Sequence, residues 1–212
     1  VYINDGAHVK PGDIAFEVEG SVRSLLQTER VMLNIMQRMS GIATTTARYQ
    51  ERLAGLKAKV LDTRKTTPGM RMLEKEAVKI GGGSNHRIGL LEMSLIKDNH
   101  VDFYGGIQQA VDAAKKYCRE TGRDLKIELE VRNTDEINQA LAAGVDRIML
   151  DNFTPERTRE AVALIAGRTE IESSGGITID TLRQYGEAGV DFISVGALTH
   201  SVKGLDMSFK AC

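Results

Sequence analysis

The sequence predicts an α/β fold in which a parallel sheet closes as a (β/α) barrel. Short apolar runs recur after residue 58, and each run ends in polar residues or glycine. Most runs are followed by a stretch with helical spacing of apolar residues, and this alternation is typical of a parallel sheet. The runs span residues 60–65, 95–100, 127–133, 148–152, 171–176 and 192–197.

The way this sheet closes is left open between a doubly wound sheet and a barrel. Polar residues gather at the end of every run rather than at one switch point, which favours the barrel, because barrel enzymes build their sites from several strand ends. No G-x-G-x-x-G follows the first unit and no G-x-x-x-x-G-K-[ST] occurs, which counts against a doubly wound nucleotide-binding sheet.

The segment before the repeating units begins with residues 1–20, which are predicted to form two short strands. Val9-Lys10-Pro11-Gly12-Asp13 joins them and carries a Pro-Gly turn signal. The chain starts at Val1 without Met, already in an apolar, strand-like phase. This start suggests the C-terminal part of something longer.

A long helical region follows, with Thr28 as its predicted cap. Gly41 is expected to bend or divide this region before it continues to about Leu53. The apolar residues at helical spacing, which we expect on its packed face, are Val31, Ile35, Met39 and Ile42.

Helices between the later runs show clear ends. The stretches 136–144 and 181–189 each end in the glycine expected after a helix, Gly144 and Gly189. A further helix is predicted over Val111 to Glu120, and it contains Cys118.

Cys118 and Cys212 are far apart in the chain and match no metal-ligand spacing. Reduced thiols and the lack of a signal peptide predict a cytoplasmic protein.

Composition argues against two classes of partner. The formal net charge is −1 over 212 residues, so no global field favours nucleic acid or an acidic membrane surface. Trp is absent and aromatic residues make up 5%, which argues against a base-stacking platform. No apolar run approaches the length needed to span a bilayer.

Cations gather at the ends of the first runs, beside the triple glycine at residues 81–83. Arg offers a planar fork for carboxylate or phosphate, Lys offers a point charge, and glycines let the backbone approach a ligand closely. This pattern predicts an anion site, with a basic loop followed by a flexible surface turn as the alternative for the Arg64-Lys65 pair. The cations are Arg64, Lys65, His86, Arg87 and Lys97, with a core or supporting role left open for His86.

Carboxylates also lie near the ends of the predicted strands. Glu128 and Glu130 share a face of one strand, and each would raise the pKa of the other unless a cation intervenes. Lys97 and Mg²⁺ are the two candidate cations. Glu128 is interpreted as a structural ion pair, whereas Glu130 and Asp151 are interpreted as ligand-facing because each lies at the top of its strand.

The last two runs end in loops rich in backbone donors, Ser174-Gly175-Gly176 and Val195-Gly196-Ala197. In barrels these positions often bind a phosphate through backbone N–H groups. A cation-rich front and a phosphate-binding rear together indicate a substrate with negative groups at both ends.

These motifs closely resemble those of the quinolinate phosphoribosyltransferases, also called carboxylating nicotinate-nucleotide pyrophosphorylases. The resemblance covers essentially the whole chain, in order. Its motifs are Glu29-Arg30, Ser40 to Thr44, LDTRKTTPG at 61–69, GGG-x-NHR at 81–87, LIKDNH at 95–100, ELEV at 128–131, IMLDN at 148–152, SSGGI at 173–177 and SVGALTHS at 194–201.

The resemblance implies a fold and a division of the chain. The fold is an incomplete (β/α) barrel of the type II phosphoribosyltransferases plus part of an N-terminal α/β sandwich domain. Residues 1–57 would be the end of the sandwich domain with connecting helices, 58–200 the catalytic barrel, and 201–212 a tail returning toward the N-terminal domain.

It also implies a reaction. Phosphoribosyl pyrophosphate and quinolinate would give nicotinate mononucleotide, pyrophosphate and CO₂ with Mg²⁺, in de novo NAD biosynthesis. Members form homodimers or higher homo-oligomers with shared sites, and the residue matching Arg30 reaches in from the neighbouring subunit. No nucleic acid or membrane takes part.

The resemblance assigns roles to the strand-end residues. Arg30, Arg64, His86, Arg87 and Lys97 would surround the dicarboxylate. Lys65 would neutralise pyrophosphate, and Glu130 and Asp151 would stabilise the ribose cation or hold Mg²⁺, directly or through substrate. The catalytic set is therefore Lys65, Lys97, Glu130 and Asp151, and the substrate-binding set adds Arg30, Thr63, Arg64, His86, Arg87, Ser174, Gly175, Gly176, Val195, Gly196 and Ala197.

Two rival functions stay open. One is a homologue with the same barrel but another acceptor, such as the molybdenum-transport-associated members, and the full set of dicarboxylate cations argues against it. The other is a non-catalytic anion-binding module. Glu130, Asp151 and Lys65 argue against that interpretation, because binding alone does not require carboxylates beside an anion.

Overall fold

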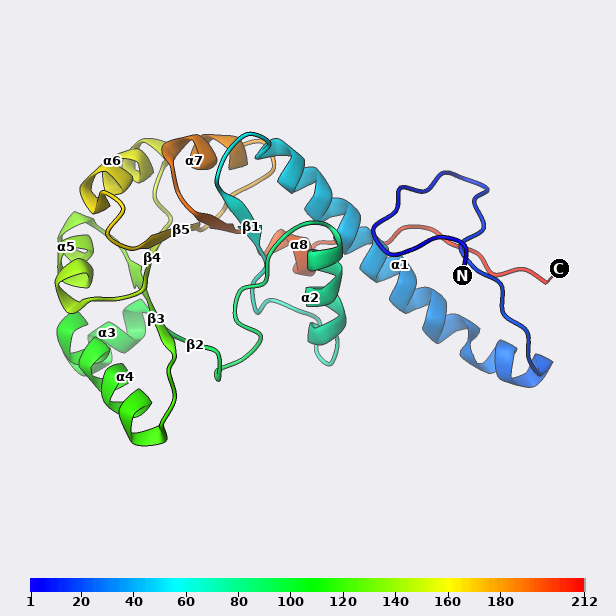
Figure 1. The fold of residues 1–212 in the computed structure, drawn as a ribbon, viewed down its shortest axis with the longest axis horizontal. Helices are drawn as coiled ribbons and strands as arrows, with labels where there is room; N and C mark the ends of the chain where they lie inside the picture. Colours follow the sequence, from blue (N-terminus) through cyan, green and yellow to red (C-terminus); the bar gives the residue numbers. More distant parts are fainter. Residues whose placement is uncertain (212) are drawn as a thin grey trace.

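The computed structural model describes residues 1–211 and consists of a curved parallel sheet with helices on its convex side (Figure 1). Cys212 lies outside the described residues. The strands are β1 Lys59–Leu61, β2 Met93–Ile96, β3 Lys126–Val131, β4 Arg147–Asp151, β5 Glu170–Ser174 and β6 Phe192–Ser194. The helices are α1 Val22–Arg52, α2 Arg71–Ile80, α3 Asp98–Tyr104, α4 Ile107–Thr121, α5 Thr134–Ala143, α6 Pro155–Ile165, α7 Leu182–Ala188 and α8 Ala197–His200.

The sheet confirms the barrel prediction and shows that the barrel is incomplete. Its strand order is β1-β6-β5-β4-β3-β2, and every pairing is parallel. This order has no reversal, as expected for a barrel and not for a doubly wound sheet. Within the described chain β1 and β2 are the two edges, so hydrogen bonds do not close the ring. All six predicted strands are present.

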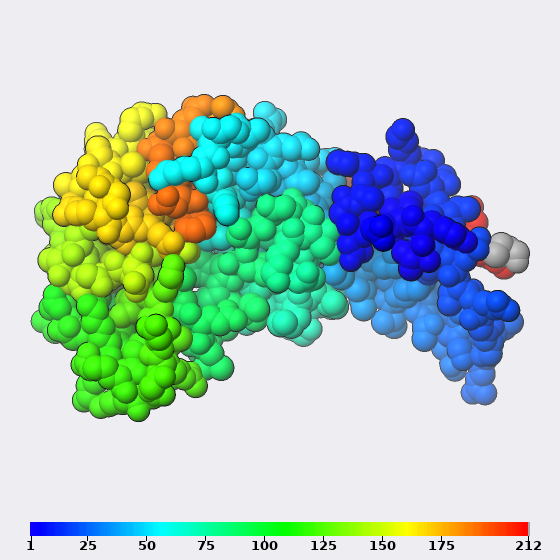
Figure 2. All heavy atoms as spheres, in the orientation of Figure 1, coloured from blue at the N-terminus to red at the C-terminus, as the bar shows by residue number. Residues whose placement is uncertain are grey.

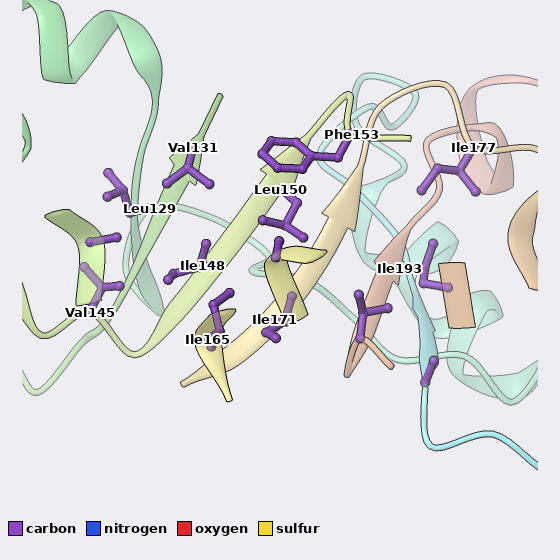
Figure 3. Close-up of a cluster of buried hydrophobic side chains, with 14 of the residues drawn as sticks. Leu129, Val131, Val145, Ile148, Leu150, Phe153, Ile165, Ile171, Ile177 and Ile193 are labelled. Carbon is purple, nitrogen blue, oxygen red and sulfur yellow. The ribbon is translucent and has the colours of Figure 1, made fainter. Parts of the chain in front are cut away.

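The hydrophobic core lies between the convex face of the sheet and the helices (Figure 3). Leu129, Ile148, Leu150 and Ile193 from neighbouring strands are all 0% exposed, and Ile165 from α6 packs with them. Burying each such side chain stabilises the fold by about 1.5–3 kcal/mol. Because successive strand residues point to opposite faces, the residues between these apolar positions face the barrel interior.

The polar barrel interior explains why polar and apolar residues alternate along the strands. On β3, Glu128 and Glu130 alternate with Leu129 and Val131. The same alternation puts Arg147 on β4 and Glu172 on β5 on the interior face, since their neighbours Ile148 and Ile171 lie in the core. The barrel interior is therefore a polar layer enclosed by an apolar one.

The predicted strands in residues 1–20 are wrong, although the turn between them is confirmed. Asp13 N donates to Lys10 O at 3.1 Å, and the N–H groups of Tyr2 and Ile3 both donate to Ala15 O. No strand is assigned to this segment. A two-stranded hairpin without a third strand or a helix to pack on is marginal, and the segment is almost wholly exposed, forming a lobe beside α1 (Figure 2).

Helix α1 begins earlier than predicted, and Gly41 does not divide it. Ser21 is the cap, because its side chain accepts a hydrogen bond from Ser24 N at 3.2 Å, while Thr28 lies inside the helix and donates to Ser24 O. A Cβ at Gly41 would lie 2.3 Å from Lys203 O. The close approach of the C-terminal tail therefore explains the glycine at position 41.

The N-terminal part of α1 runs away from the sheet (Figure 1). Val31, predicted for a packed face, is 64% exposed, whereas Ile42 is fully buried. The tail returns along the same helix, where Leu205 N donates to Gln37 O and Gln37 Nε2 donates to Met207 O. Among the described helices, none is both long and apolar enough to cross a membrane.

Candidate functional site

The carboxyl ends of the strands bring the predicted residues to one rim. In the register of the sheet, Asp151 on β4 pairs with Ser174 on β5, and Leu61 on β1 pairs with Ser194 on β6. Glu130 lies one residue before the end of β3, and Lys97 directly follows β2. Parallel strands end on the same side, so this rim, here called the mouth, collects these side chains.

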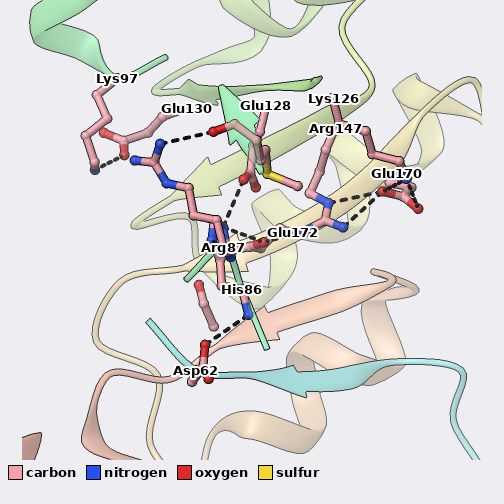
Figure 4. Close-up of polar contacts among 12 residues, drawn as sticks. Asp62, His86, Arg87, Lys97, Lys126, Glu128, Glu130, Arg147, Glu170 and Glu172 are labelled. Carbon is pink, nitrogen blue, oxygen red and sulfur yellow. Dashed lines mark hydrogen bonds and ion pairs between the residues drawn. The ribbon is translucent and has the colours of Figure 1, made fainter. Parts of the chain in front are cut away.

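Lys97 and Glu130 meet at the mouth (Figure 4). Lys97 Nζ lies 2.5 Å from Glu130 Oε2, with the lysine half-exposed and the glutamate buried. Lys97 also caps α3, since its backbone N–H donates to His100 Nδ1 at 2.9 Å. Lys97 and Mg²⁺ were the two candidate cations for these carboxylates, and Lys97 is paired with Glu130.

Arg64 and Arg87 bring two guanidinium groups to the same region. Burial lowers the pKa of Arg87, and the nearby positive charge of Arg64 lowers it further. Arg87 donates to the backbone oxygen of Met93 at 3.2 Å, which anchors it beside β2. Two guanidinium groups this close favour a bound group with more than one negative charge.

His86 lies beneath the mouth with both ring nitrogens facing protein atoms. Its Nδ1 accepts the backbone N–H of Arg87 at 2.8 Å, and its Nε2 lies 2.9 Å from Glu128 Oε2. Burial lowers the pKa of His86, so the ring is neutral. An accepting Nδ1 leaves the proton on Nε2. The structure thus places His86 in the supporting role that was left open for it in the sequence analysis.

Below His86, Glu128 and Glu172 form a buried carboxyl pair, and both are 0% exposed. Burial, together with the charge of Glu128, raises the pKa of Glu172 to about 8, and burial raises the pKa of Glu128. Arg147 Nη1 lies 3.2 Å from Glu172 Oε2. Glu128 thus faces the His86 ring, and the charges of Arg147 and Arg87 oppose the rise in its pKa that burial causes.

The His86, Glu128 and Glu172 ligand atoms lie within 4.8 Å of one another, a spacing that a metal ion could bridge. Arg147 already provides a positive charge to Glu172. A proton retained at Glu172 balances much of the remaining charge. The cluster is therefore a buried, charged layer beneath the mouth that Arg147 supports.

The loop that carries Lys65 is braced from two helices. Thr199 Oγ1 donates to Lys65 O at 2.8 Å, and Lys65 N donates to Thr63 Oγ1 at 3.1 Å. Arg38 on α1 donates to Thr67 Oγ1, to Thr199 O and to the fully buried Glu74. Sequence reasoning missed Arg38 and Glu74.

The glycine loops are open to a ligand. Gly175 and Gly176 have φ values of 100° and 61°, which glycine adopts without strain. In the described chain, no hydrogen bond uses the N–H groups of Gly175, Gly176, Gly196 and Ala197, whereas Val195 N donates to Leu61 O. A Cβ at Gly196 would lie 3.2 Å from Lys65 Cδ, so Lys65 borders this loop.

Arg30 is not brought to the mouth of its own chain. It is exposed in the part of α1 that runs away from the sheet. Among the described residues it makes no hydrogen bond or ion pair with the mouth.

A cavity of about 500 Å³ lies at the opposite end of the strands. It is lined by Lys57, Lys126, Glu170 and Asp191 among others. Lys57 pairs with Asp191 and Lys126 pairs with Glu170. Its charges are thus compensated, and in barrels this end serves stability, not catalysis.

Comparison with known proteins gives a consistent family. Residues 1–40 match the family model of the quinolinate phosphoribosyl transferase N-terminal domain, and residues 42–210 match that of the C-terminal domain. The chain is 45% identical over 204 residues to the probable nicotinate-nucleotide pyrophosphorylase [carboxylating] of Bacillus subtilis, covering 96% of this chain and 70% of that protein.

A chloroplastic nicotinate-nucleotide pyrophosphorylase [carboxylating] of Arabidopsis thaliana is 44% identical over 221 residues. That alignment covers 97% of this chain and 63% of the plant protein, so the chain spans about two thirds of such relatives. Among solved structures, NadC from Streptococcus pyogenes superposes with a TM-score of 0.92 at 46% identity, covering 99% of this chain and 72% of that one.

Proposed function

The chain belongs to the quinolinate phosphoribosyltransferase family, enzymes of NAD biosynthesis, and we propose that its mouth transfers phosphoribosyl from phosphoribosyl pyrophosphate to quinolinate with loss of CO₂. The observation that carries this proposal is the pair Arg64 and Arg87, near enough for one charge to lower the pKa of the other. They share the mouth with the carboxylates of Glu130 and Asp151.

The two arginines suit the two adjacent carboxylates of quinolinate. A guanidinium presents parallel N–H donors that match a carboxylate edge. Each charge-assisted hydrogen bond contributes about 1.5–3 kcal/mol, so losing one carboxylate would weaken binding by at least tenfold. Lys97 adds a third cation, and His86 supports Arg87 from below by accepting its backbone N–H.

The phosphate groups of phosphoribosyl pyrophosphate would bind on the other side of the mouth. The unused N–H groups of Gly175, Gly176, Gly196 and Ala197 suit the 5′-phosphate, because backbone donors bind phosphate oxygens without a competing side chain. Lys65 borders the Gly196 loop and would neutralise the departing pyrophosphate.

Glu130 and Asp151 would act on the ribose. Departure of pyrophosphate leaves positive character on the sugar, and fixed carboxylates stabilise that charge. After the ring nitrogen is alkylated, the pyridinium stabilises the carbanion left by loss of the adjacent carboxylate as CO₂. For that step the protein's contribution is to position the ring.

We propose Mg²⁺ as the cofactor. Glu130 and Asp151 supply the oxygen ligands that Mg²⁺ prefers together with substrate phosphates. When bound, the ion would supply positive charge to the pyrophosphate. These two residues would hold it directly or through substrate.

We also propose that Arg30 completes the dicarboxylate site of a neighbouring subunit in a homodimer or larger assembly. Its exposed position on the outlying part of α1 supports this, since it is distant from the mouth of its own chain. The cytoplasm is the proposed location, in keeping with the free thiol of Cys118.

Incubation with phosphoribosyl pyrophosphate, Mg²⁺ and either quinolinate or nicotinate tests the function. We expect equal amounts of nicotinate mononucleotide and CO₂ from quinolinate, and little product from nicotinate. Preference for nicotinate would indicate another acceptor. Binding of both substrates without product would indicate an anion-binding module.

A further inference from the structure

Asn152, the residue after β4, has an uncommon backbone conformation. Its φ is 55°, and among the described non-glycine residues only Ala166 shares a positive φ. Asn adopts this left-handed region more readily than most residues, but the conformation persists only where surrounding contacts hold it. One such contact is the hydrogen bond from Asn152 N to Ser174 O at 2.9 Å.

The Asn152 side chain lies between two parts of the mouth. Its Nδ2 donates to Asp151 Oδ2 at 2.7 Å. On its other side it covers Gly175, where an added Cβ would lie 2.2 Å from Asn152 Oδ1 and 2.9 Å from Asn152 N. The residue therefore contacts a proposed catalytic carboxylate and a proposed phosphate loop at once.

We infer that Asn152 is a positioning residue that holds the Asp151 carboxylate in register with the Ser174-Gly175-Gly176 loop. The inference rests on the proposed function, because it concerns where the ribose lies between a carboxylate and its own 5′-phosphate. A misplacement of about 1 Å at a reacting centre can cost about a hundredfold in rate.

An amide suits this position better than a charged donor. Nδ2 fixes one oxygen of Asp151 without neutralising the carboxylate, so the charge and the second oxygen stay available to the ribose or to a metal ion. An Asp at 152 would tolerate the same backbone conformation, but it would replace the donor with a second negative charge beside Asp151.

The first test is Asn152→Gly, with Ala166→Gly as the matched control. Both changes place glycine at a left-handed position, but Ala166 follows α6, and its replacement removes no contact at the mouth. We expect Asn152→Gly to lower kcat about tenfold and to raise the KM for phosphoribosyl pyrophosphate, while the KM for quinolinate stays within about twofold. Kinetics equal to those of Ala166→Gly would overturn the inference.

The second test is Asn152→Asp, read from its pH profile. A second carboxylate raises the pKa of its neighbour, so the acidic limb of kcat/KM should move to higher pH. If the substitution only destabilised the protein, kcat/KM would fall by the same factor at every pH and its acidic limb would stay at the same pH. That result would count against positioning.

Calorimetric titration with phosphoribosyl pyrophosphate and Mg²⁺, without quinolinate, separates this inference from the proposed function. If the wild type binds this ligand but does not convert quinolinate, weaker binding by Asn152→Gly still supports the inference while the acceptor assignment fails. Equal binding by wild type and variant would overturn the inference. No binding by the wild type would overturn both.

Discussion

Lys97 and Glu130 form an ion pair of 2.5 Å across the ends of β2 and β3, although they are 33 residues apart in the chain. The pair joins Lys97, which is proposed to bind the dicarboxylate, to Glu130, which is proposed to act on the ribose. Glu130 is 7% exposed, and an isolated buried carboxylate is costly. The pair therefore places a cation directly against a nearly buried carboxylate next to the anion site.

The Lys97→Met change removes this cation while keeping most of the side-chain volume. We expect kcat/KM for quinolinate to fall about a hundredfold, because a charge-assisted contact is lost and Glu130 is left unpaired. Lys79→Met breaks an exposed pair with Glu76 on α2 and serves as the control. If both variants have the steady-state constants of the wild type, Lys97 does not bind quinolinate.

Arg64→Ala should raise the KM for quinolinate far more than that for phosphoribosyl pyrophosphate. The reason is that Arg64 lies near enough to Arg87 for its charge to lower the pKa of Arg87, on the side of the mouth proposed for the dicarboxylate. Exposed Arg119 on α4 offers a control charge, so Arg119→Ala should change neither KM. Equal increases in both KM values for Arg64→Ala would refute the assignment.

Asp151→Asn should lower kcat with little loss of quinolinate affinity. The carboxylate is proposed to act on the ribose cation, which exists only during the reaction. Steady-state kinetics gives kcat, and calorimetry gives the quinolinate affinity. Complete loss of quinolinate binding would contradict a role confined to the ribose.

Shared sites predict recovery of activity in mixed oligomers. Arg30→Ala and Asp151→Asn should each be weakly active alone. A mixed dimer would contain one site in which both residues are intact, so its activity should approach half that of the wild type. Heterodimers verified by mass spectrometry that recover no activity would exclude sharing through Arg30.

The buried pair Glu128 and Glu172 predicts a pH dependence of stability. The pKa of Glu172 is raised to about 8 in the folded protein, so between about pH 4.5 and 8 the folded state retains a proton that the unfolded state releases. This contribution to the free energy of unfolding is fully present below pH 4.5 and is lost as the pH rises toward 8.

Glu172→Gln should remove this slope, because glutamine mimics the protonated acid. One retained proton corresponds to about 1.4 kcal/mol per pH unit. Urea unfolding at several pH values measures it, with exposed Glu120→Gln as the control. A slope in Glu172→Gln equal to that of the wild type would show that Glu172 does not hold the proton.

Local sequence patterns predicted the parts of the fold that depend on local physics. Each apolar run became a strand, and Gly144 and Gly189 end their helices in the left-handed conformation. The Pro-Gly turn is also present. These features depend on side-chain alternation and backbone freedom, which a short stretch of chain carries by itself.

Long-range contacts account for the predictions that were wrong. Gly41 was expected to bend or divide the helical region, but the helix runs through it undivided, and the backbone at Lys203 passes too close for a Cβ. Val31 has the spacing of a packed residue, yet no surface of the described chain covers it. Spacing indicates which residues share a face, and it does not reveal what lies opposite that face.

The sequence by itself determined the parallel strands, the polar strand ends and the family to which the chain belongs. Only the tertiary structure decided how those polar residues divide between ligand and support. His86 accepts the backbone N–H of Arg87 below the mouth, Arg38 braces the Lys65 loop from another helix, and Asn152 links Asp151 to Gly175. The physical reason is that a donor's role depends on which acceptor lies within about 3 Å, and the folded chain alone sets those distances.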